Sequence, residues 1–390
     1  MFRISRIQEV MQALPRSTFE RWVDVHQADK YSKGFTSWDQ LVAMVYAQVA
    51  GVSGLRELEA GFNSQRTHHY HLGTKQIRRS TLSDANANPR KLGVFTEAVE
   101  ALMSQARRSL RHEIKDLLYA LDATSITLKG PGFDVWTGTP TRCGQGIKLH
   151  VQYSVHEAIP RRASFTAANV NDLAEGLKVK LERGATYVFD KAYCDYNWWA
   201  GFDAAGARYV TRLKINAAVR TVSTRPILAA DAGSVLEDQI VHLSNRNPGA
   251  KRKNHYTQPL RRIVIARPDH ESPLVLATND LSAPAREIAE IYKSRWQVEL
   301  FFKWIKQHLK IKRFLGRSQV AVHLQILTAL ITYLLLTLYQ ARHGLKGTLW
   351  NLLAELRATL FQRPTIEADQ YRRRQQQRHE LTQRQPTLFL

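Results

Sequence analysis

The sequence predicts a mixed α/β protein with an all-α domain at its N-terminus. Residues 1 to about 112 are mainly helix-like in pattern. From Lys115 onward, short alternating or all-apolar runs appear, which are typical of β-strands. Strand-like and helix-like runs then follow one another, an order that indicates a sheet covered by helices.

The first region, residues 1–112, is predicted to be a helical domain. "FTSWDQLVAMVYAQVAG" is a predicted helix with Ser37 as its N-cap, and it ends at Gly51. "TKQIRRSTLSDANANP" places Arg78 and Arg79 just ahead of another helix start. Helix, turn, helix and a basic approach to a third helix are compatible with DNA binding. A helical dimerisation domain fits the same pattern equally well.

Residues 113–343 are predicted to form the α/β domain. "DLLYALDATSITL", "IKLHVQYSVH" and "RRASFTAANV" are its first strands. "ATYVFDKAY" and "ARYVTRLK" are further strands, with "NDLAEGLKVKLERG" and "DYNWWAGFDAAG" as helices. Residues from about 216 to 284 contain shorter β-like runs and are predicted to be a β-rich insertion. One long helix, "APAREIAEIYKSRWQVELFFKWIKQHL", follows it.

The C-terminal part combines an apolar run with a basic tail. "VAVHLQILTALITYLLLTLY" is long enough to cross a bilayer. We interpret it as a buried core helix, because a single spanning helix at this position would leave the basic body unexplained. A membrane-associated basic protein is the alternative. Residues 344–390 are predicted to form a basic C-terminal helix and tail, partly disordered.

Composition limits the partners and the compartment. The chain has 390 residues and a formal net charge of +22, which indicates a polyanionic partner and most simply nucleic acid. The two cysteines, Cys143 and Cys194, argue against a disulfide scaffold and fit a reducing compartment. The N-terminal residues lack the pattern of a secretory signal. The predicted location is therefore cytoplasmic.

Two aspartates stand out by their position in apolar strands. Asp122 lies within the first predicted strand, and Asp190 ends the strand "YVFD". A carboxylate in such surroundings is costly unless a metal or another cation compensates its charge. A turn or cap residue would explain either aspartate alone. Two on neighbouring strands would meet at one edge of the sheet, where open α/β sheets place their active sites.

The long helix carries a polar stripe beside an apolar one. Tyr292, Arg295, Glu299 and Lys306 fall within a stripe roughly 60° wide. A second, apolar stripe lies roughly 110° round the helix and can pack on the sheet. The spacing can therefore bring Glu299 to the sheet edge that carries the aspartates. A solvated helix face would explain the charges, but not this ordered adjacency.

Three carboxylates at one place would form an oxygen-rich site for Mg²⁺ or Mn²⁺. Two such ions about 4 Å apart can activate a water or a 3′-hydroxyl for attack on a phosphodiester. Arg295, Lys303 and Lys306 on the same helix would bind the flanking phosphates.

The spacing on this helix resembles a known family signature. Tyr292, two residues, Arg295, three residues, Glu299, six residues and Lys306 are similar to the Y-R-E-K signature of insertion-sequence DDE transposases of the fourth group. The "RW" dipeptide and Lys303 also resemble that family. "LDATSITL" resembles its first-Asp motif and "YVFDKAYCDY" its second. The resemblance covers about residues 115–340.

The resemblance implies a fold and a metal centre. The fold would be an RNase H-like core with a β-rich insertion. The implied catalytic and metal-binding residues are Asp122, Asp190 and Glu299, which would hold two Mg²⁺ or Mn²⁺ ions.

The resemblance also implies a DNA substrate and a reaction. Tyr292, Arg295 and Lys306 would position the phosphates of the transposon ends, and double-stranded terminal repeats and target DNA would be the partners. Each end would be nicked to free a 3′-hydroxyl, which is later joined to target DNA. Related members form a hairpin on the way. Two protomers would bridge two ends as a homodimer on DNA.

One feature departs from the family, and one alternative function remains. Relatives can stack a flipped base on a tryptophan of the insertion, whereas here Tyr256 and His255 are the aromatic-type candidates. The hairpin step is therefore less well supported than nicking and joining. A catalytically inactive DNA-binding regulator derived from a transposase is the alternative, although all three carboxylates are present.

Overall fold

A computed structural model of the chain divides into two compact units. One unit comprises Met1–Leu110 together with Ile305–Leu390, and the other comprises Arg111–Trp304. The structure describes residues 5–110, 117–137, 145–214, 217–244, 253–268, 270–311 and 313–362. Most of the tail predicted from residue 344 onward therefore lies outside the described residues.

The first unit is helical. Both of its sequence segments contribute helices to one body, and most of the described helices come from the N-terminal segment. The described helices that lie wholly within it are α1 (Arg6–Met11), α2 (Arg16–Val25), α3 (Ser37–Ala50), α4 (Leu55–Asn63), α5 (Arg66–Leu72), α6 (Arg79–Ala87), α7 (Arg90–Leu110), α12 (Gln319–Arg342) and α13 (Leu349–Thr359).

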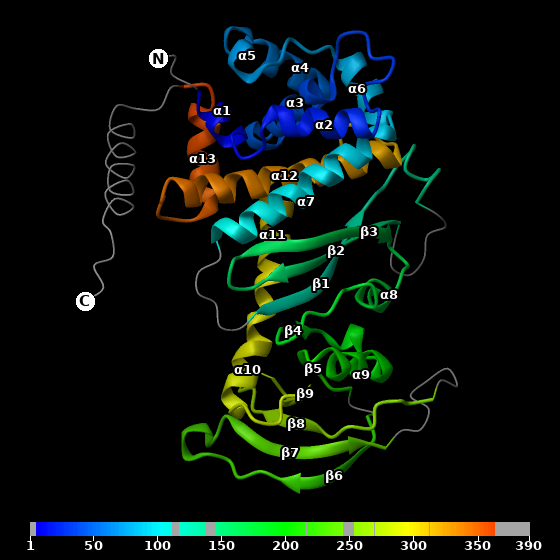
Figure 1. Cartoon of the computed structure of the whole chain (residues 1–390), viewed down its shortest axis with the longest axis vertical. Coiled ribbons are helices and arrows are strands. Elements are labelled where there is room, and N and C mark those ends of the chain that lie inside the picture. The colour runs from blue at the N-terminus through cyan, green and yellow to red at the C-terminus, as the bar shows by residue number, and fades with distance from the viewer. Residues whose placement is uncertain are drawn as a thin grey trace, which may run out of the picture. The chain divides into compact units, whose positions relative to one another are not determined.

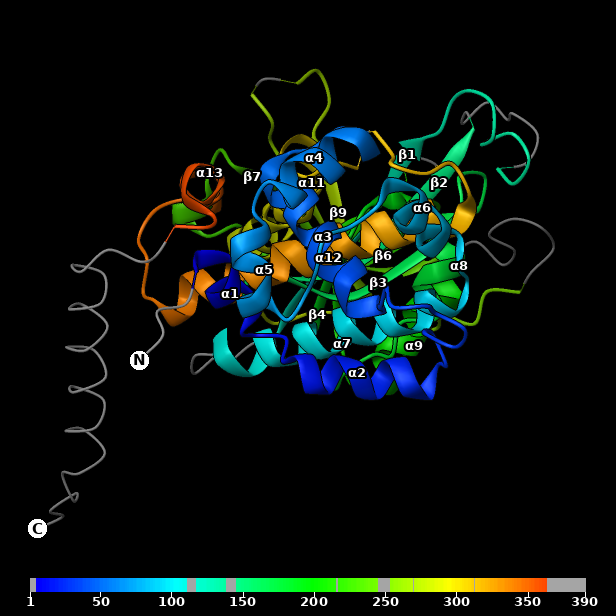
Figure 2. The same ribbon diagram turned by 90° about the horizontal axis from the view of Figure 1, so that it is seen from above.

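Helix α12 is the central helix of this unit. It is long and apolar enough to cross a membrane, but 83% of its most apolar window is buried. It lies along α7 and packs on α3 (Figure 1 and Figure 2). This packing explains why residues after 304 group with the N-terminal helices, whereas the sequence predicted one α/β domain as far as residue 343.

Helix α3 begins one residue earlier than its sequence predicts. Thr36, not Ser37, is the N-cap, and it forms a capping box with Asp39. The Ser37 hydroxyl instead donates to Asp29 at 2.7 Å. The local signal for a helix start was present, but neighbouring hydroxyl residues compete for the cap position.

The second unit is built on a sheet of nine strands. Their order across the sheet is β3-β2-β1-β4-β5-β9-β8-β7-β6. The strands are β1 (Leu118–Thr127), β2 (Gly146–Ser154), β3 (Ile159–Ala167), β4 (Thr186–Phe189), β5 (Arg208–Arg212), β6 (Val219–Thr224), β7 (Val235–Leu243), β8 (Leu260–Ile265) and β9 (Leu274–Thr278).

The strand directions change along this sheet. Strands β1, β2 and β3 form an antiparallel meander, whereas β1, β4 and β5 are parallel. Strands β6 to β9 come from the predicted β-rich insertion. They continue the same sheet, because β9 pairs antiparallel with β5. The insertion therefore extends the core sheet and does not form a separate layer.

Helices cover both faces of the sheet's central strands. Figure 1 shows α8 (Asp172–Gly176) and α9 (Tyr196–Ala205) on one side, with α10 (Ala285–Ser294) on the other. An aromatic core lies under α9, and it includes Tyr187, Phe189, Trp198, Trp199 and Phe202. Of these, Tyr187 and Phe189 come from β4, where they alternate with the buried Thr186 and Val188 of the opposite face, as a strand covered on both sides requires.

Two helix predictions need correction. The run "NDLAEGLKVKLERG" forms only the five residues of α8, with the Asn171 side chain as its cap. The predicted long helix is two helices, α10 and α11 (Trp296–His308), separated at Arg295. The backbone N–H of Arg295 bonds to the carbonyl of Tyr292, and its own carbonyl accepts from Val298. These contacts over three residues replace the regular α-helical pattern.

Candidate active site

The register of the parallel strands sets the two aspartates side by side. Leu121 of β1 pairs with Phe189 of β4. The next residue in each strand is an aspartate, Asp122 and Asp190 respectively. Asp190 also starts a short 3₁₀ helix, η1 (Lys191–Tyr193), where its Oδ1 accepts from the Lys191 N–H at 2.5 Å. The sheet edge predicted from sequence is thus present at the end of β4.

Helix α11 covers the face of the sheet that carries Asp122. Asp122 lies opposite Val151 and two residues from Ala120, which lies opposite Tyr153. These four side chains share one face of the sheet. The ring of Phe301 from α11 packs on Tyr153, with centroids 5.3 Å apart. The apolar stripe of the helix therefore contacts the sheet as its spacing predicted.

One arginine joins two of the carboxylates. Arg295 Nη2 lies 2.6 Å from Glu299 Oε1, and Arg295 Nη1 lies 3.6 Å from Asp122 Oδ2. The Arg295 side chain is only 15% exposed, so these contacts act in a partly desolvated place. The Arg295 guanidinium thus lies between Glu299 and Asp122, which are far apart in the chain.

The electrostatics of Asp122 indicate a crowded acidic site. The pKa of Asp122 is raised to about 6, mainly by burial and in smaller part by the nearby carboxylates of Glu299 and Asp190. The Ala123 N–H and the Arg295 guanidinium oppose this change. A buried carboxylate with two other carboxylates close by favours a bound cation, which would compensate the negative charge.

The residues present fit a hard divalent cation by their chemistry. Asp122, Asp190 and Glu299 offer only carboxylate oxygens, the ligands that Mg²⁺ and Mn²⁺ prefer. Among the described residues, no three acidic, histidine or cysteine side chains already stand close enough to form a metal site. Arg295 occupies the space between two of the carboxylates. A cation that contacts all three would therefore compete with this guanidinium.

Tyr292 lies beside the same group. Its ring is within cation–π distance of Arg295, at 5.8 Å. Burial raises the pKa of the Tyr292 hydroxyl, and the charges of Arg295, Asp190 and Arg212 also act on it. The structure therefore brings together Asp122, Asp190, Glu299 and two of the predicted DNA-contact residues.

Of the remaining predicted DNA contacts, Lys303 follows Glu299 by about one turn of the same helix, and the others belong to the helical unit. Lys303 is an exposed residue of α11, whereas Lys306 belongs to the helical unit. Arg78 and Arg79 are exposed at the start of α6 in that unit.

The candidate aromatic residues for base stacking differ in accessibility. Tyr256 is only 3% exposed, and its hydroxyl lies 3.2 Å from that of Tyr209 in the core. It cannot stack on a base without leaving the core, so this prediction is wrong for Tyr256. His255 is exposed.

Sequence reasoning missed two groups near the aspartates. Arg212 ends β5, the parallel neighbour of β4, and acts on Tyr292. Tyr193 is buried in η1, close enough to Asp122 and Asp190 for their charges to act on its pKa, which burial raises. The position of Arg212 at the end of a parallel strand was the available signal.

Carboxylates on neighbouring parallel strands, flanked by arginines in a strongly basic chain, are typical of an enzyme that acts on nucleic acid. Residues 113–335 match the family model described as the transposase DDE domain. The chain belongs to this family and is a DNA transposase, an enzyme whose family depends on divalent metal ions. Residues 3–75 match a family described only as a domain of unknown function.

Known proteins resemble the chain over most of its length. A protein of Sinorhizobium fredii named as transposase y4zB is 39% identical over 74% of this chain and 78% of its own. A Geobacillus stearothermophilus protein named as the transposase of insertion sequence element IS5377 is 29% identical over 60% of this chain and 58% of its own. Among solved structures, a cryo-EM piggyBac transposase synaptic complex with hairpin DNA aligns with a TM-score of 0.49. The identity is 10%, over 98% of this chain and 83% of that chain.

Proposed function

We propose that this DNA transposase belongs to the fourth group of insertion-sequence DDE transposases. Its Y-R-E-K signature would be Tyr292, Arg295, Glu299 and Lys306. The contact of one Arg295 guanidinium with both Glu299 and Asp122 is the observation that carries the proposal. It links the signature helix to the first-Asp strand, which a chance match of spacing would not do.

An RNase H-like core is the fold that suits this arrangement. The order β3-β2-β1-β4-β5, with an antiparallel meander followed by parallel strands, supports it. In this proposal the catalytic domain begins near residue 113, and strands β6 to β9 are an insertion between the second aspartate and the glutamate.

Asp122, Asp190 and Glu299 would hold two Mg²⁺ ions, or Mn²⁺ in their place. Such ions, when bound, activate the attacking oxygen and stabilise the leaving oxygen of a phosphodiester. The scissile phosphodiester would lie beside these three carboxylates, because Glu299 and Asp190 both lie close enough to Asp122 for their charges to act on it.

The cations of the same helix region would orient the DNA. Arg295 is planar and partly buried, so it can bind a phosphate through two parallel hydrogen bonds. Tyr292 packs against it and limits its rotation. Lys303 and Lys306 would contact phosphates further along the strand, and Arg78 and Arg79 would contact DNA from the helical unit.

The proposed reaction is hydrolytic nicking at each transposon end, followed by attack of the freed 3′-hydroxyl on target DNA. Two protomers would act together as a homodimer on two terminal repeats. The site of action would be DNA in the bacterial cytoplasm. A hairpin intermediate is not part of the proposal, because of the two stacking candidates Tyr256 is buried in the core, which leaves only the smaller ring of His255 exposed.

A nicking assay tests this proposal. The substrate is a duplex from the DNA that flanks the coding region, with Mg²⁺ or EDTA. The wild-type protein should nick one strand of the duplex in Mg²⁺ and should not cut it in EDTA. Asp190→Asn should abolish nicking but retain DNA binding. Lys191→Gln, an exposed neighbour, is the matched control and should retain nicking. Binding without any nicking by the wild-type chain would instead support a catalytically inactive regulator.

A further inference from the structure

A basic surface with an exposed tyrosine lies on the helical unit, outside the carboxylate site. We name it the Tyr31 surface and define it by Lys30, Tyr31, Lys33, Lys75 and Arg90. Tyr31 is 82% exposed, and all four cations are exposed as well. Most of the surface lies within residues 3–75, the part that matches a domain of unknown function.

Cations flank the tyrosine ring. The Lys30 ammonium lies 5.4 Å from the ring centroid, and the Arg90 guanidinium lies 6.0 Å from it. A Cβ placed on Gly34 would lie 3.6 Å from the Lys75 ammonium, so Lys75 reaches the same loop from the α5–α6 connection. Two parts of the chain therefore place positive charge beside the Tyr31 ring, and a third brings Lys75 to the loop that carries it.

The loop that carries Tyr31 is held by contacts with the starts of α3 and α7. Both Asp29 carboxylate oxygens accept from the Ser37 N–H at 2.9 Å. The buried Lys91 ammonium lies 3.5 Å from Asp29 Oδ1, and Asn88 donates to the Ala28 carbonyl at 3.5 Å. These contacts tie the loop to the starts of α3 and α7, so the exposed ring sits on a fixed support.

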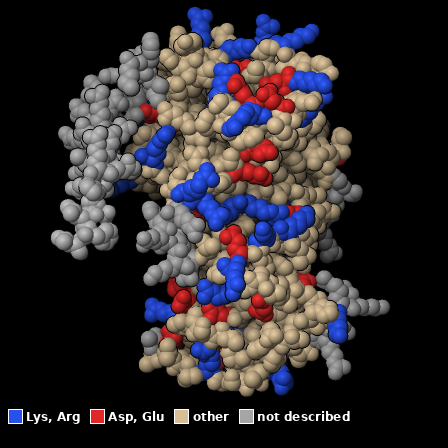
Figure 3. Space-filling model, in the orientation of Figure 1, with Lys and Arg blue, Asp and Glu red and all other residues tan. Residues whose placement is uncertain are grey.

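The surface has an excess of positive charge. Within the described residues, none of its four cations forms an ion pair with an acidic side chain, and the nearby Asp29 is already used by Ser37 and Lys91. Elsewhere, Lys and Arg side chains alternate with acidic ones across the face shown in Figure 3. Charge alone therefore does not mark a site, but uncompensated cations round an exposed ring do.

Tyr31 also has an unusual backbone. Its φ of 68° is in the left-handed region, which a residue with a bulky side chain rarely adopts. The neighbouring turn holds it there, because the Ser32 N–H bonds to the Asp29 carbonyl at 2.9 Å. The fold thus keeps an apolar ring in water on a strained residue, where a small residue would serve a turn better.

We propose that the Tyr31 surface binds duplex DNA. Lys30, Lys33, Lys75 and Arg90 contact phosphates on either side of one groove, and the Tyr31 ring lies against the sugars or a base edge within it. A rigid aromatic ring flanked by cations suits this task, because phosphates neutralise the cations while the ring meets apolar sugar surface. The inference rests on the proposed function and deepens it, because it gives the helical unit a DNA-binding surface in addition to Arg78 and Arg79 and separate from the metal site.

Binding measurements in EDTA test this proposal without depending on catalysis. The triple variant Lys30→Gln, Lys33→Gln, Arg90→Gln removes three cations. The matched control removes three exposed cations from α4, α5 and the α12–α13 connection: Arg56→Gln, Arg66→Gln, Lys346→Gln. Affinity for a 40-bp duplex (about four turns) is measured from low to high salt, with flanking DNA and with a shuffled sequence.

We expect the Tyr31-surface triple variant to lower the slope of log affinity against log salt by about 2 to 3, since each phosphate contact contributes about 0.9. The loss should be similar on both duplexes, and the control variant should change the slope by less than about 1. Tyr31→Ser should weaken binding about tenfold, whereas Tyr31→Phe should not.

Unchanged binding by both the triple variant and Tyr31→Ser would overturn the proposal. The same variants are also tested for binding to phosphatidylserine vesicles. If they lose vesicle binding but keep their affinity for DNA, the proposal is overturned and the surface is assigned to a membrane. The outcome is independent of the carboxylate site, because Asp190→Asn in the nicking assay can fail or succeed without altering binding in EDTA. Circular dichroism of each variant separates lost contacts from lost folding.

Discussion

Replacing Asp122 should make the metal-free protein more stable at neutral pH. Asp122 is 20% exposed, and its pKa is about 6 because of burial and the nearby carboxylates. Ionising it in the folded protein therefore costs free energy that the unfolded chain does not lose. Asn has the same shape without the charge, and it can still accept the hydrogen bond from the Ala123 N–H.

The size of the effect follows from the two pKa values of Asp122, about 6 in the folded protein and 3.8 for an ordinary aspartate. Each tenfold change in proton affinity is worth about 1.4 kcal/mol, so the penalty is about 3 kcal/mol. The attraction of Arg295 is already included, since it contributes to the same pKa.

The pH window follows from the sign of this change. Folding favours the protonated carboxyl, so the penalty is absent below pH 3.8, grows between pH 3.8 and about 6, and is complete above that. The difference in unfolding free energy between Asp122→Asn and wild type should therefore rise across this range. Beyond the window it should remain constant.

Urea unfolding in EDTA, followed by circular dichroism at pH 4 and pH 8, measures this difference. We expect near equality at pH 4 and a gain of about 2 to 3 kcal/mol for the variant at pH 8. A variant that is less stable than wild type at pH 8 would refute the idea that the carboxylate is held at a cost for function.

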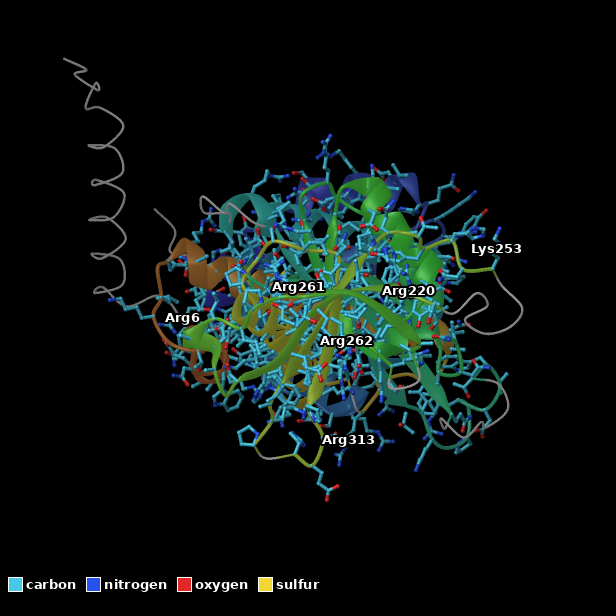
Figure 4. All side chains as sticks on the ribbon, turned by 90° about the horizontal axis from the view of Figure 1, so that it is seen from below. Arg6, Arg220, Lys253, Arg261, Arg262 and Arg313 are labelled. Atoms are coloured by element: carbon cyan, nitrogen blue, oxygen red, sulfur yellow. The ribbon has the colours of Figure 1, made fainter. Side chains whose placement is uncertain are left out.

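Three other perturbations have definite expected outcomes. Arg261, which is labelled in Figure 4, is 1% exposed. It donates to the two carboxylate oxygens of Asp238 at 2.7 and 2.6 Å, so Arg261→Met should lower the free energy of unfolding by about 3 kcal/mol in urea. Less than about 1 kcal/mol would contradict it. A Cβ on Gly176 would lie 2.9 Å from the ring of Tyr193, in the 3₁₀ helix that follows the second aspartate, so Gly176→Ala should reduce nicking far more than DNA binding. Equal loss of both would indicate general unfolding. Removing Arg295 frees two carboxylates, so Arg295→Gln should bind Mn²⁺ more tightly in a titration while its nicking falls. Unchanged Mn²⁺ affinity would show that the guanidinium does not compete for the site.

Sequence patterns predicted which residues would meet, because strand ends and helix faces have fixed periods. The position of Asp122 beside Asp190 follows from parallel pairing, which places equivalent strand positions at one level. The approach of Glu299 follows from an apolar stripe on α11 that packs on the same face. The RNase H-like assignment and the roles of these residues stay proposals.

Other features could not be read from local patterns. Periodicity shows the side on which Arg295 lies, but not that it interrupts the helix or stands between two carboxylates. The sequence pattern predicted β-strands after residue 216. It did not predict that β9 would pair with β5, because strand pairing depends on residues far apart in the chain. The same limit hid the packing of α12 on α7, which assigns the C-terminal helices to the helical unit.

The central claim is that three carboxylates from distant parts of the sequence bind the same divalent ions. Oxidative cleavage with Fe²⁺ tests this claim most directly. With added hydrogen peroxide and ascorbate, Fe²⁺ bound in place of Mg²⁺ reduces the peroxide to hydroxide and a hydroxyl radical, which cuts the nearby backbone, and ascorbate returns the iron to Fe²⁺. The account predicts cuts close to Asp122, Asp190 and Glu299 in one sample, all suppressed by excess Mg²⁺ and all lost in Asp190→Asn. Cuts at a single one of these segments, or cuts that persist in that variant, would contradict it.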